Sequence, residues 1–138
     1  MKDVDELEVL FVDDEPAVLD GIRRSLRRLR PRWKASFHSD PVAGLLAYRD
    51  AMASLDVVVC DLNMPQVGGL QFLQAVHEHS PHTVRIALSG QLDIKSMLGV
   101  GKHADCHVCK PVHAEVLCAT IVEHWLRRQH GPTPGTAP

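Results

Sequence analysis

Side chains suited to cation binding and nucleophilic chemistry stand directly after apolar segments of this 138-residue chain. They are Asp13 and Asp14 after residues 9–12, Asp61 after 57–60, Ser89 after 84–88, and Lys110 after 107–108. Apolar runs of this length are typical of strands buried in a parallel sheet, and the carboxyl ends of parallel strands meet at one edge. We therefore expect three carboxylates, one hydroxyl and one ammonium group to converge there.

Such a cluster is suited to phosphoryl transfer assisted by a divalent cation. Crowded carboxylates raise one another's pKa and repel unless a hard cation lies among them, and a small all-oxygen pocket suits Mg²⁺. Lys110 would hold one phosphoryl oxygen as a point charge, and the Ser89 hydroxyl would donate to another. Asp61 would then be the in-line nucleophile that forms an acyl phosphate.

The segments around these side chains alternate between two patterns. Short β-branched runs predict strands, and longer runs with apolar residues at helical spacing predict helices. The predicted strands are 9–12, 33–37, 57–60, 84–88 and 107–108. The predicted helices are one that enters at 14–16 and stops at Pro31, and then 41–53, 70–79, 93–100 and 112–129. This alternation predicts an α/β domain with a doubly wound parallel sheet, whose first and third strands are central.

The first predicted helix is amphipathic. Its apolar residues are Val18, Leu19, Ile22, Leu26 and Leu29, and its other side carries Arg23, Arg24, Arg27 and Arg28. Asp14 is a candidate N-cap, and Pro16 suits the first turn. The arginines form either a solvated face or a nucleic-acid contact. The lack of interleaved aromatic residues and of excess positive charge favours the solvated face.

Composition places the chain among ordinary globular proteins, with 45% hydrophobic and 23% charged residues and a formal net charge of -2. This charge gives no support to direct nucleic-acid or membrane binding. The first eight residues lack a secretory pattern and no long apolar run is present, so a cytoplasmic location and four reduced cysteines are expected. Residues 1–130 are predicted to form one domain, and residues 131–138 a flexible tail or a truncated linker.

In combination, the motifs resemble the receiver domain of bacterial two-component response regulators. The resemblance rests on Asp13-Asp14, on 61–69 (DLNMPQVGG), on Ser89-Gly90 and on Lys110-Pro111, and it covers roughly residues 8–129. It implies a flavodoxin-like (βα)5 fold with strand order 2-1-3-4-5. It also implies that Asp61 accepts a phosphoryl group from a histidine kinase, a phosphotransfer protein or a small acyl phosphate. In that case, phosphorylation changes the conformation of the chain and thereby switches a protein interface. The resemblance thus implies that the chain is not an enzyme in the usual sense.

The resemblance also implies a role for individual residues. Asp14, Asp61 and the backbone carbonyl of Asn63 would bind Mg²⁺ or Mn²⁺, and Asp13 would do so directly or through water. Ser89 and Lys110 would bind the phosphoryl oxygens. The Lys110–Pro111 peptide bond would be cis, which only an X-Pro bond tolerates at low cost.

Three positions depart from the usual pattern of receivers. Most receivers carry Tyr or Phe three residues before the lysine, where the ring turns inward on phosphorylation, and this chain has His107. His107 either serves as that ring or brings a titratable group into the switch. Asn63 and Gln91 occupy positions that tune dephosphorylation. Since neither is a carboxylate that could activate water, we expect a moderately long-lived phosphoryl group. Gly68 replaces an Asp found in many receivers, with no expected effect on the chemistry.

Two further features have alternative interpretations. Cys106 and Cys109, with nearby histidines, suggest a zinc or redox site, but residues three apart on a strand point to opposite faces, which favours ordinary strand residues. The last predicted helix carries a broad apolar arc, formed by Val116, Leu117, Ile121, Val122, Trp125 and Leu126. That arc indicates either a well-covered core helix, or a surface for a homodimer through the fourth and last helices or for an output domain.

The resemblance leaves rival functions open. A degenerate receiver would act as an interaction module without phosphate, although the complete acidic set argues against it. A small phosphatase or a flavin protein could use the same layout, but the acidic loop 13–16 would repel the phosphate of a flavin. The Arg-rich first helix borders the predicted site, so a partner kinase could dock there. The segment 85–91 is similar to receivers joined to HD-GYP domains, which suggests an output domain absent from this chain.

Overall fold

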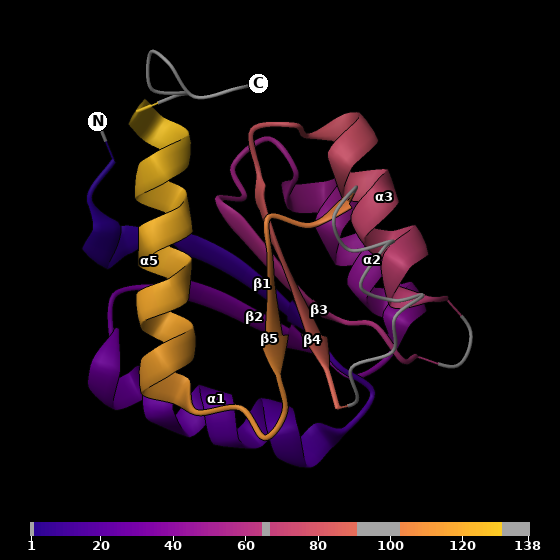
Figure 1. Cartoon of the computed structure of the whole chain (residues 1–138), viewed down its shortest axis with the longest axis horizontal. Coiled ribbons are helices and arrows are strands. Elements are labelled where there is room, and N and C mark those ends of the chain that lie inside the picture. The colour runs from indigo at the N-terminus through magenta and orange to yellow at the C-terminus, as the bar shows by residue number, and fades with distance from the viewer. Residues whose placement is uncertain (1, 65–66, 91–102, 131–138) are drawn as a thin grey trace.

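Five parallel strands form one sheet at the centre of the molecule, in the order β2-β1-β3-β4-β5 (Figure 1). The computed structural model describes residues 2–64, 67–90 and 103–130. The strands are β1 Glu8–Val12, β2 Lys34–His38, β3 Val57–Asp61, β4 Val84–Ser89 and β5 Cys106–Cys109. The predicted strand order and the central places of β1 and β3 are confirmed.

Helices cover both faces of the sheet (Figure 1). The described helices are η1 Val4–Glu6, α1 Pro16–Leu29, α2 Pro41–Ala51, α3 Gly69–His79 and α5 Ala114–His130. α1 and α5 lie on one face, and α2 and α3 lie on the other. The predicted fourth helix, 93–100, lies outside the described residues. None of the helices in the described part of the chain has both the length and the apolar composition to cross a bilayer.

Alternation along the central strands produces two apolar cores. Val9 and Phe11 of β1 pack with residues of α1 and α5, whereas Leu10 and Val12 pack with residues of α2 and α3. Successive side chains of a strand point to opposite faces, so a strand covered on both sides must be apolar throughout. All five residues of β3 are buried for this reason.

The ends of several elements differ from the sequence prediction by one or two residues. The helix predicted over 41–53 ends at Ala51, the one over 112–129 spans Ala114–His130, and the short strand at 107–108 spans Cys106–Cys109. The predicted N-cap of α1 was wrong. Glu15 occupies that position without a side-chain capping bond, because the loop is held instead by Asp13, whose Oδ1 accepts a hydrogen bond from the Glu15 amide at 2.9 Å.

A buried ionic network lies at the amino end of β4. Arg85 is only 6% exposed, and its guanidinium contacts Asp105 at 3.7 Å and donates to Nδ1 of His77. Asp105 also accepts from the Arg85 amide at 2.8 Å and forms an ion pair with Arg128 of α5. The network therefore connects α3, β4, the segment before β5, and α5. No sequence motif pointed to it.

Candidate functional site

The predicted chemical side chains meet at the carboxyl ends of the strands, which lie at the bottom of Figure 1. The backbone hydrogen bonds between neighbouring strands continue to this edge of the sheet. The Asp13 amide donates to the His38 carbonyl at 3.1 Å, and the Lys110 amide donates to the Ser89 carbonyl at 2.8 Å. Because each site residue directly ends or follows a paired strand, its backbone is held by the sheet.

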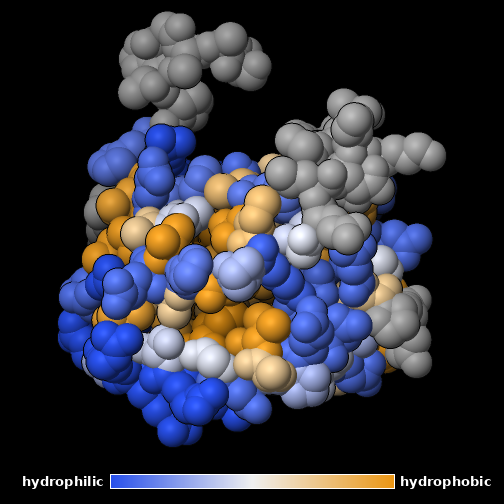
Figure 2. Space-filling view, turned by 60° about the horizontal axis from the view of Figure 1, so that its bottom comes forward, coloured by the Kyte–Doolittle hydropathy of each residue, from blue (hydrophilic) through white to orange (hydrophobic). Residues whose placement is uncertain are grey.

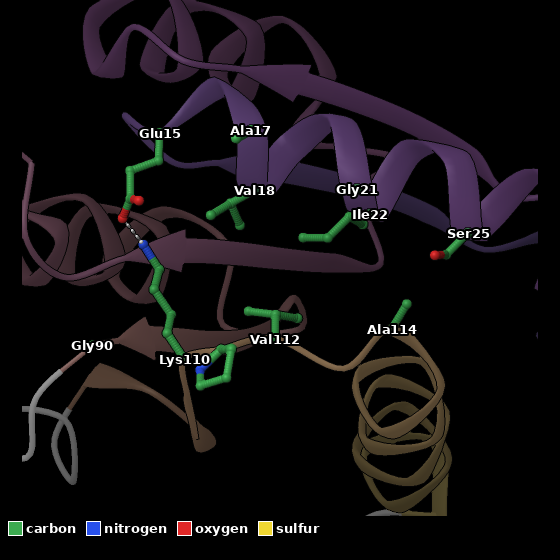
Figure 3. Close-up of a pocket in the computed structure, with 11 residues that line it drawn as sticks. Glu15, Ala17, Val18, Gly21, Ile22, Ser25, Gly90, Lys110, Val112 and Ala114 are labelled. Carbon is green, nitrogen blue, oxygen red and sulfur yellow. Dashed lines mark hydrogen bonds and ion pairs between the residues drawn. The ribbon is translucent and has the colours of Figure 1, made fainter.

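Lys110 is the cation at the centre of this cluster. Its Nζ lies 2.9 Å from Oδ2 of Asp13, 2.8 Å from Oε1 of Glu15 and 3.4 Å from Oδ2 of Asp61. The Asp13 side chain is fully buried and that of Asp61 is 3% exposed, whereas Glu15 reaches solvent. Lys110 therefore bridges the ends of β1 and β3 from the end of β5. The contact with Glu15, drawn in Figure 3, was not predicted from the sequence.

The loop after β3 is held close to the acceptor candidate. The Asn63 amide donates to Oδ1 of Asp61 at 3.1 Å, which orients that carboxylate. α3 begins at Gly69, where a Cβ atom would lie only 2.0 Å from the backbone oxygen of Asp61. Glycine is required at position 69 because any side chain there would displace the backbone of the site.

Burial changes the electrostatics of both charged partners. It raises the pKa of Asp61 to about 7, with further increases from the charge of Asp13 and from Asp14, while the Asn63 amide and Lys110 partly oppose the shift. Burial also opposes the charge of Lys110, but its hydrogen bonds to Glu15 and Asp13 outweigh this effect and raise the pKa of Lys110. Lys110 is therefore a permanent cation at neutral pH, and Asp61 needs more positive charge nearby to be fully ionised.

The carboxylates fit a hard divalent cation. One oxygen from each of four residues lies within 4.8 Å of all the others, and the four are Asp13, Asp14, Glu15 and Asp61. Oxygen donors in a small pocket are the ligands that Mg²⁺ prefers, and Asp14 and Glu15 leave the pocket open to the solvent from which the ion would bring its waters. The pKa of Asp61 is raised mainly by burial and then by its acidic neighbours, so a bound cation would favour its ionised form.

The other predicted residues take different places. Ser89 ends β4 and is buried, and the Lys110–Pro111 peptide bond is cis. His107 aligns with Ala87 on the face of the sheet that α2 and α3 cover, and its Nε2 is buried without a hydrogen-bond partner among the described residues. Gln91 lies outside the described residues.

The alternative metal or redox site around β5 gains no support. Cys106 packs with the core on the α5 side. Cys109 is exposed, and because it lies three residues further along the strand, its side chain is on the opposite face. All four cysteines of the chain are free. Within the described ranges, the acidic group at the strand ends is the single cluster with the spacing of a metal site.

An open groove of about 680 Å³ borders the acidic cluster. α1 forms one wall with Val18, Gly21 and Ile22, and the loop after β5 forms the other with Pro111 and Val112. In Figure 3 the side chains of Val18 and Ile22 face Val112, and the Glu15–Lys110 pair stands at the end of the groove. Figure 2 shows an apolar hollow bordered by hydrophilic side chains on this side of the molecule. Hence an apolar groove adjoins the charged site.

The fold and the site agree with one protein family. The profile of the response regulator receiver domain matches residues 9–122, and the chain belongs to this family. Receiver domains are signalling domains that bind Mg²⁺ in an acidic pocket and interact with histidine kinases or phosphotransfer proteins.

Individual proteins support the assignment. The hydrogenase transcriptional regulatory protein HoxA of Cupriavidus necator is 35% identical over 116 residues, which are 82% of this chain and 23% of HoxA. The receiver domain structure from Clostridium thermocellum superposes with a TM-score of 0.79 at 26% identity, covering 90% of this chain and 97% of that one. The receiver domain of an HD domain-containing protein from Pseudomonas fluorescens gives 0.74 at 25% identity, covering 91% and 98%. The chain spans less than half the length of the curated relatives it matches.

Proposed function

We propose that this chain is a phospho-accepting receiver in which Asp61 takes the phosphoryl group. A carboxylate oxygen of Asp61 attacks the phosphorus of a phosphohistidine or of an acyl phosphate, the bond from phosphorus to the donor breaks, and the donor leaves with the electron pair. The observation that carries this proposal is the burial of Asp61, which is 2% exposed, beside Lys110 and Asp13 in an acidic cluster.

Asp14, Asp61, the Asn63 carbonyl and Asp13, the last directly or through water, are the proposed ligands of Mg²⁺ or Mn²⁺. When bound, the ion supplies positive charge that lowers the pKa of Asp61 and neutralises phosphoryl oxygens. The ordered Asn63 amide keeps the carboxylate oriented for in-line attack. Because Asn63 cannot act as a general base, we infer that the acyl phosphate is moderately long-lived.

The switch is proposed to use Lys110, Ser89 and His107. Lys110 exchanges its contacts with Asp13 and Asp61 for a phosphoryl oxygen, and the Ser89 hydroxyl donates to another oxygen. Movement of Ser89 opens space beside Ala87, next to which His107 lies in the sheet. The imidazole, with its buried Nε2 unpaired among the described residues, turns inward and changes the surface around β5.

The groove between α1 and the loop after β5 is the proposed docking site for a helix of the phosphodonor protein. It is lined by apolar side chains and ends at Lys110. Charged side chains on the exposed side of α1, among them Arg24 and Arg28, set partner choice through charge.

We also propose the wider context of the domain. Residues 1–130 act as one receiver domain in the cytoplasm, and 131–138 form a tail or linker toward an output domain. Val116 and Leu126 of α5 are 58% and 38% exposed, and they are the proposed start of a homodimer or output surface. The similarity to the receiver of an HD domain-containing protein supports the suggested HD-type output.

Intact mass spectrometry after incubation with acetyl phosphate and Mg²⁺ tests the acceptor. Wild type should gain about 80 Da, the mass of one phosphoryl group. Asp61→Asn and a metal-free sample should gain nothing, while Asp50→Asn, which removes an exposed carboxylate of α2, should behave as wild type. Absence of the adduct under conditions that label an ordinary receiver indicates a degenerate site. Catalytic hydrolysis of phosphate esters indicates a phosphatase instead, and bound flavin absorbance indicates a flavin protein.

A second experiment separates docking from chemistry. Gly21→Leu places a side chain into the groove at a position where a Cβ meets nothing within 4 Å. Labelling by acetyl phosphate should be unchanged, whereas transfer from a phosphorylated histidine phosphotransfer domain that labels wild type should slow by about tenfold or more. Equal slowing with both donors contradicts the docking role.

A further inference from the structure

A second charged surface lies on the other side of α1, toward the edge of the sheet. A cleft of about 160 Å³ there is lined by Arg23, Arg27 and Arg30 and by side chains of the strand region that includes Trp33 and Phe37. The Arg23 guanidinium lies 4.8 Å from the centre of the Phe37 ring, and that of Arg30 lies 5.7 Å from the Trp33 ring. The aromatic rings therefore hold two of the three cations in place. We call this surface the arginine cleft.

The arginine cleft has an excess of positive charge. All of its charged lining residues are arginines. Arg30 forms an ion pair with Asp5 at 3.1 Å, so the acidic N-terminal segment of the chain already places one carboxylate at the end of the cleft. Arg23 and Arg27 are exposed and have no acidic partner among the described residues. The surface thus already contacts one carboxylate through Arg30. The guanidinium groups of Arg23 and Arg27 remain available to further carboxylates.

The arginine cleft runs along an open edge of the sheet. Among the described strands, β2 pairs with β1 alone (Figure 1). Two backbone bonds define which residues face β1: the Lys34 amide donates to the Leu7 carbonyl at 2.9 Å, and the Asp13 amide donates to the His38 carbonyl at 3.1 Å. Because backbone groups alternate in direction along a strand, those of Ala35 and Phe37 point to the open edge. They are available to pair with another strand.

Space exists on both faces beside this edge. The arginine cleft lies on the α1 face, and a second cleft of about 370 Å³ lies on the α2 face, where Lys34, Asp50 and Ser54 contribute to its lining. Ala35 lines both clefts. An added strand would therefore place alternate side chains in the two clefts, and those on the α1 face would meet Arg23 and Arg27.

We propose that the open edge of β2 binds an extended acidic segment of a partner protein, which adds to the sheet as a sixth strand and directs alternate carboxylates into the arginine cleft. Main-chain hydrogen bonds to Ala35 and Phe37 supply affinity, and the arginines supply the choice of sequence. This surface is separate from Asp61 and from the groove on the other side of α1, so the inference goes beyond the proposed function.

Other occupants fit less well. A second copy of this chain, paired edge to edge, would bring arginines against arginines. A nucleic acid would need exposed rings for base stacking, but Trp33 is buried and Phe37 is already stacked on Phe11 at 5.0 Å. The formal net charge of -2 also gives no general attraction for a phosphate backbone.

The probe is a capped peptide of alternating Glu and Val, titrated at low salt into the ¹⁵N-labelled chain and followed by amide chemical shifts. The Ala35 and Phe37 amides should shift, and the affinity should fall as salt rises. Arg27→Glu should weaken binding by about tenfold. The matched control is Arg24→Glu, which makes the same charge change on α1 at an exposed residue outside the cleft and should bind within about twofold of wild type.

A backbone variant tests strand addition itself. Ala35→Pro removes an amide that points away from β1, a position where an edge strand tolerates proline, and it should abolish peptide binding while circular dichroism and Asp61 labelling stay as in wild type. Equal losses for Arg24→Glu and Arg27→Glu, shifts confined to the arginines, or no shifts at all would overturn the proposal. So would displacement of the peptide by a DNA or RNA oligonucleotide of equal charge.

Discussion

The ionised carboxylate of Asp61 destabilises the fold, and the environment that makes it unfavourable also suits it to cation binding. Its burial and its acidic neighbours favour the protonated form, so binding of a cation, or of a proton, at the site is favourable in the folded chain. Lys110 relieves only part of this cost because it is shared with Asp13 and Glu15. Sites in which stability is lost to keep a reactive group charged are common in functional proteins.

This electrostatic strain makes stability depend on pH. The pKa of Asp61 is about 7 in the fold against an ordinary 3.8. The contribution of protonated Asp61 to the free energy of unfolding is therefore fully present below pH 3.8, and it is lost as pH rises through about 7. Asp61→Asn cannot ionise and does not suffer this loss. Without divalent metal, we expect the variant to be more stable than wild type by about 1–3 kcal/mol at pH 8, with the gap closing toward pH 4.

Urea unfolding at pH 4.5 and pH 8 in a chelating buffer measures the gap. Asp50→Asn, at an exposed position, controls for the loss of one carboxylate. A difference between wild type and Asp61→Asn that is the same at both pH values contradicts the raised pKa.

The turn that leads into α3 is tightly packed against the backbone of the site. The turn between β3 and α3 brings the Gly69 backbone against the carbonyl of Asp61, and the Gly69 amide donates to the Leu62 carbonyl at 3.2 Å. In α1, by contrast, Gly21 stands in mid-helix where a Cβ meets open space. The two glycines, in helices on opposite faces of the sheet, thus differ in the space around them: Gly69 is tightly enclosed and Gly21 is not.

Gly69→Ala and Gly21→Ala should therefore change stability in opposite directions. Gly69→Ala must displace backbone, and we expect a loss of about 2–4 kcal/mol in the free energy of unfolding together with slower labelling of Asp61. Gly21→Ala should stabilise the domain by about 0.5–1 kcal/mol because alanine is the better helix former. Denaturant midpoints of the two variants provide the comparison, and a mild effect at position 69 would refute the tight turn.

Over the whole molecule, the two ends of the sheet serve different purposes. The carboxyl ends of the strands carry the reactive cluster, whereas the buried network of Arg85, Asp105 and Arg128 joins α5 to β4 at the far end. A buried guanidinium that loses its carboxylate is strongly destabilising, although an intact buried pair adds little. We therefore expect the network to help fix the orientation of α5 on the sheet.

Asp105→Asn should reveal this role. It leaves Arg85 buried with its charge uncompensated, and we expect a loss of about 2–4 kcal/mol in the free energy of unfolding. Labelling of Asp61 in the folded variant should be unchanged, because the network and the cluster lie at opposite ends of β4. Glu123→Gln, which removes an exposed carboxylate paired with Arg127 on α5, should cost less than about 1 kcal/mol. Equal costs for the two variants would contradict the burial argument.

Much of the site was predictable because strand ends are visible in the sequence. Apolar runs followed by Asp13, Asp61, Ser89 and Lys110 located the cluster, since parallel strands must bring their carboxyl ends together. The contact of Glu15 with Lys110 was not found, although another acid beside Asp14 was a signal. The necessity of Gly69 was also missed, because a close backbone approach has no local pattern.

By itself, the amino-acid sequence determined the order of strands and helices, the acidic cluster and the family resemblance, because these depend on periodicity and on residues near strand ends. Only the tertiary structure decided which face His107 occupies, how Lys110 divides its contacts among three carboxylates, and where Arg85 finds its partners. It also decided that the arginines of α1 lie beside an open strand edge. Such contacts join residues far apart in the chain, and their energies depend on distance and burial, which a sequence pattern does not contain.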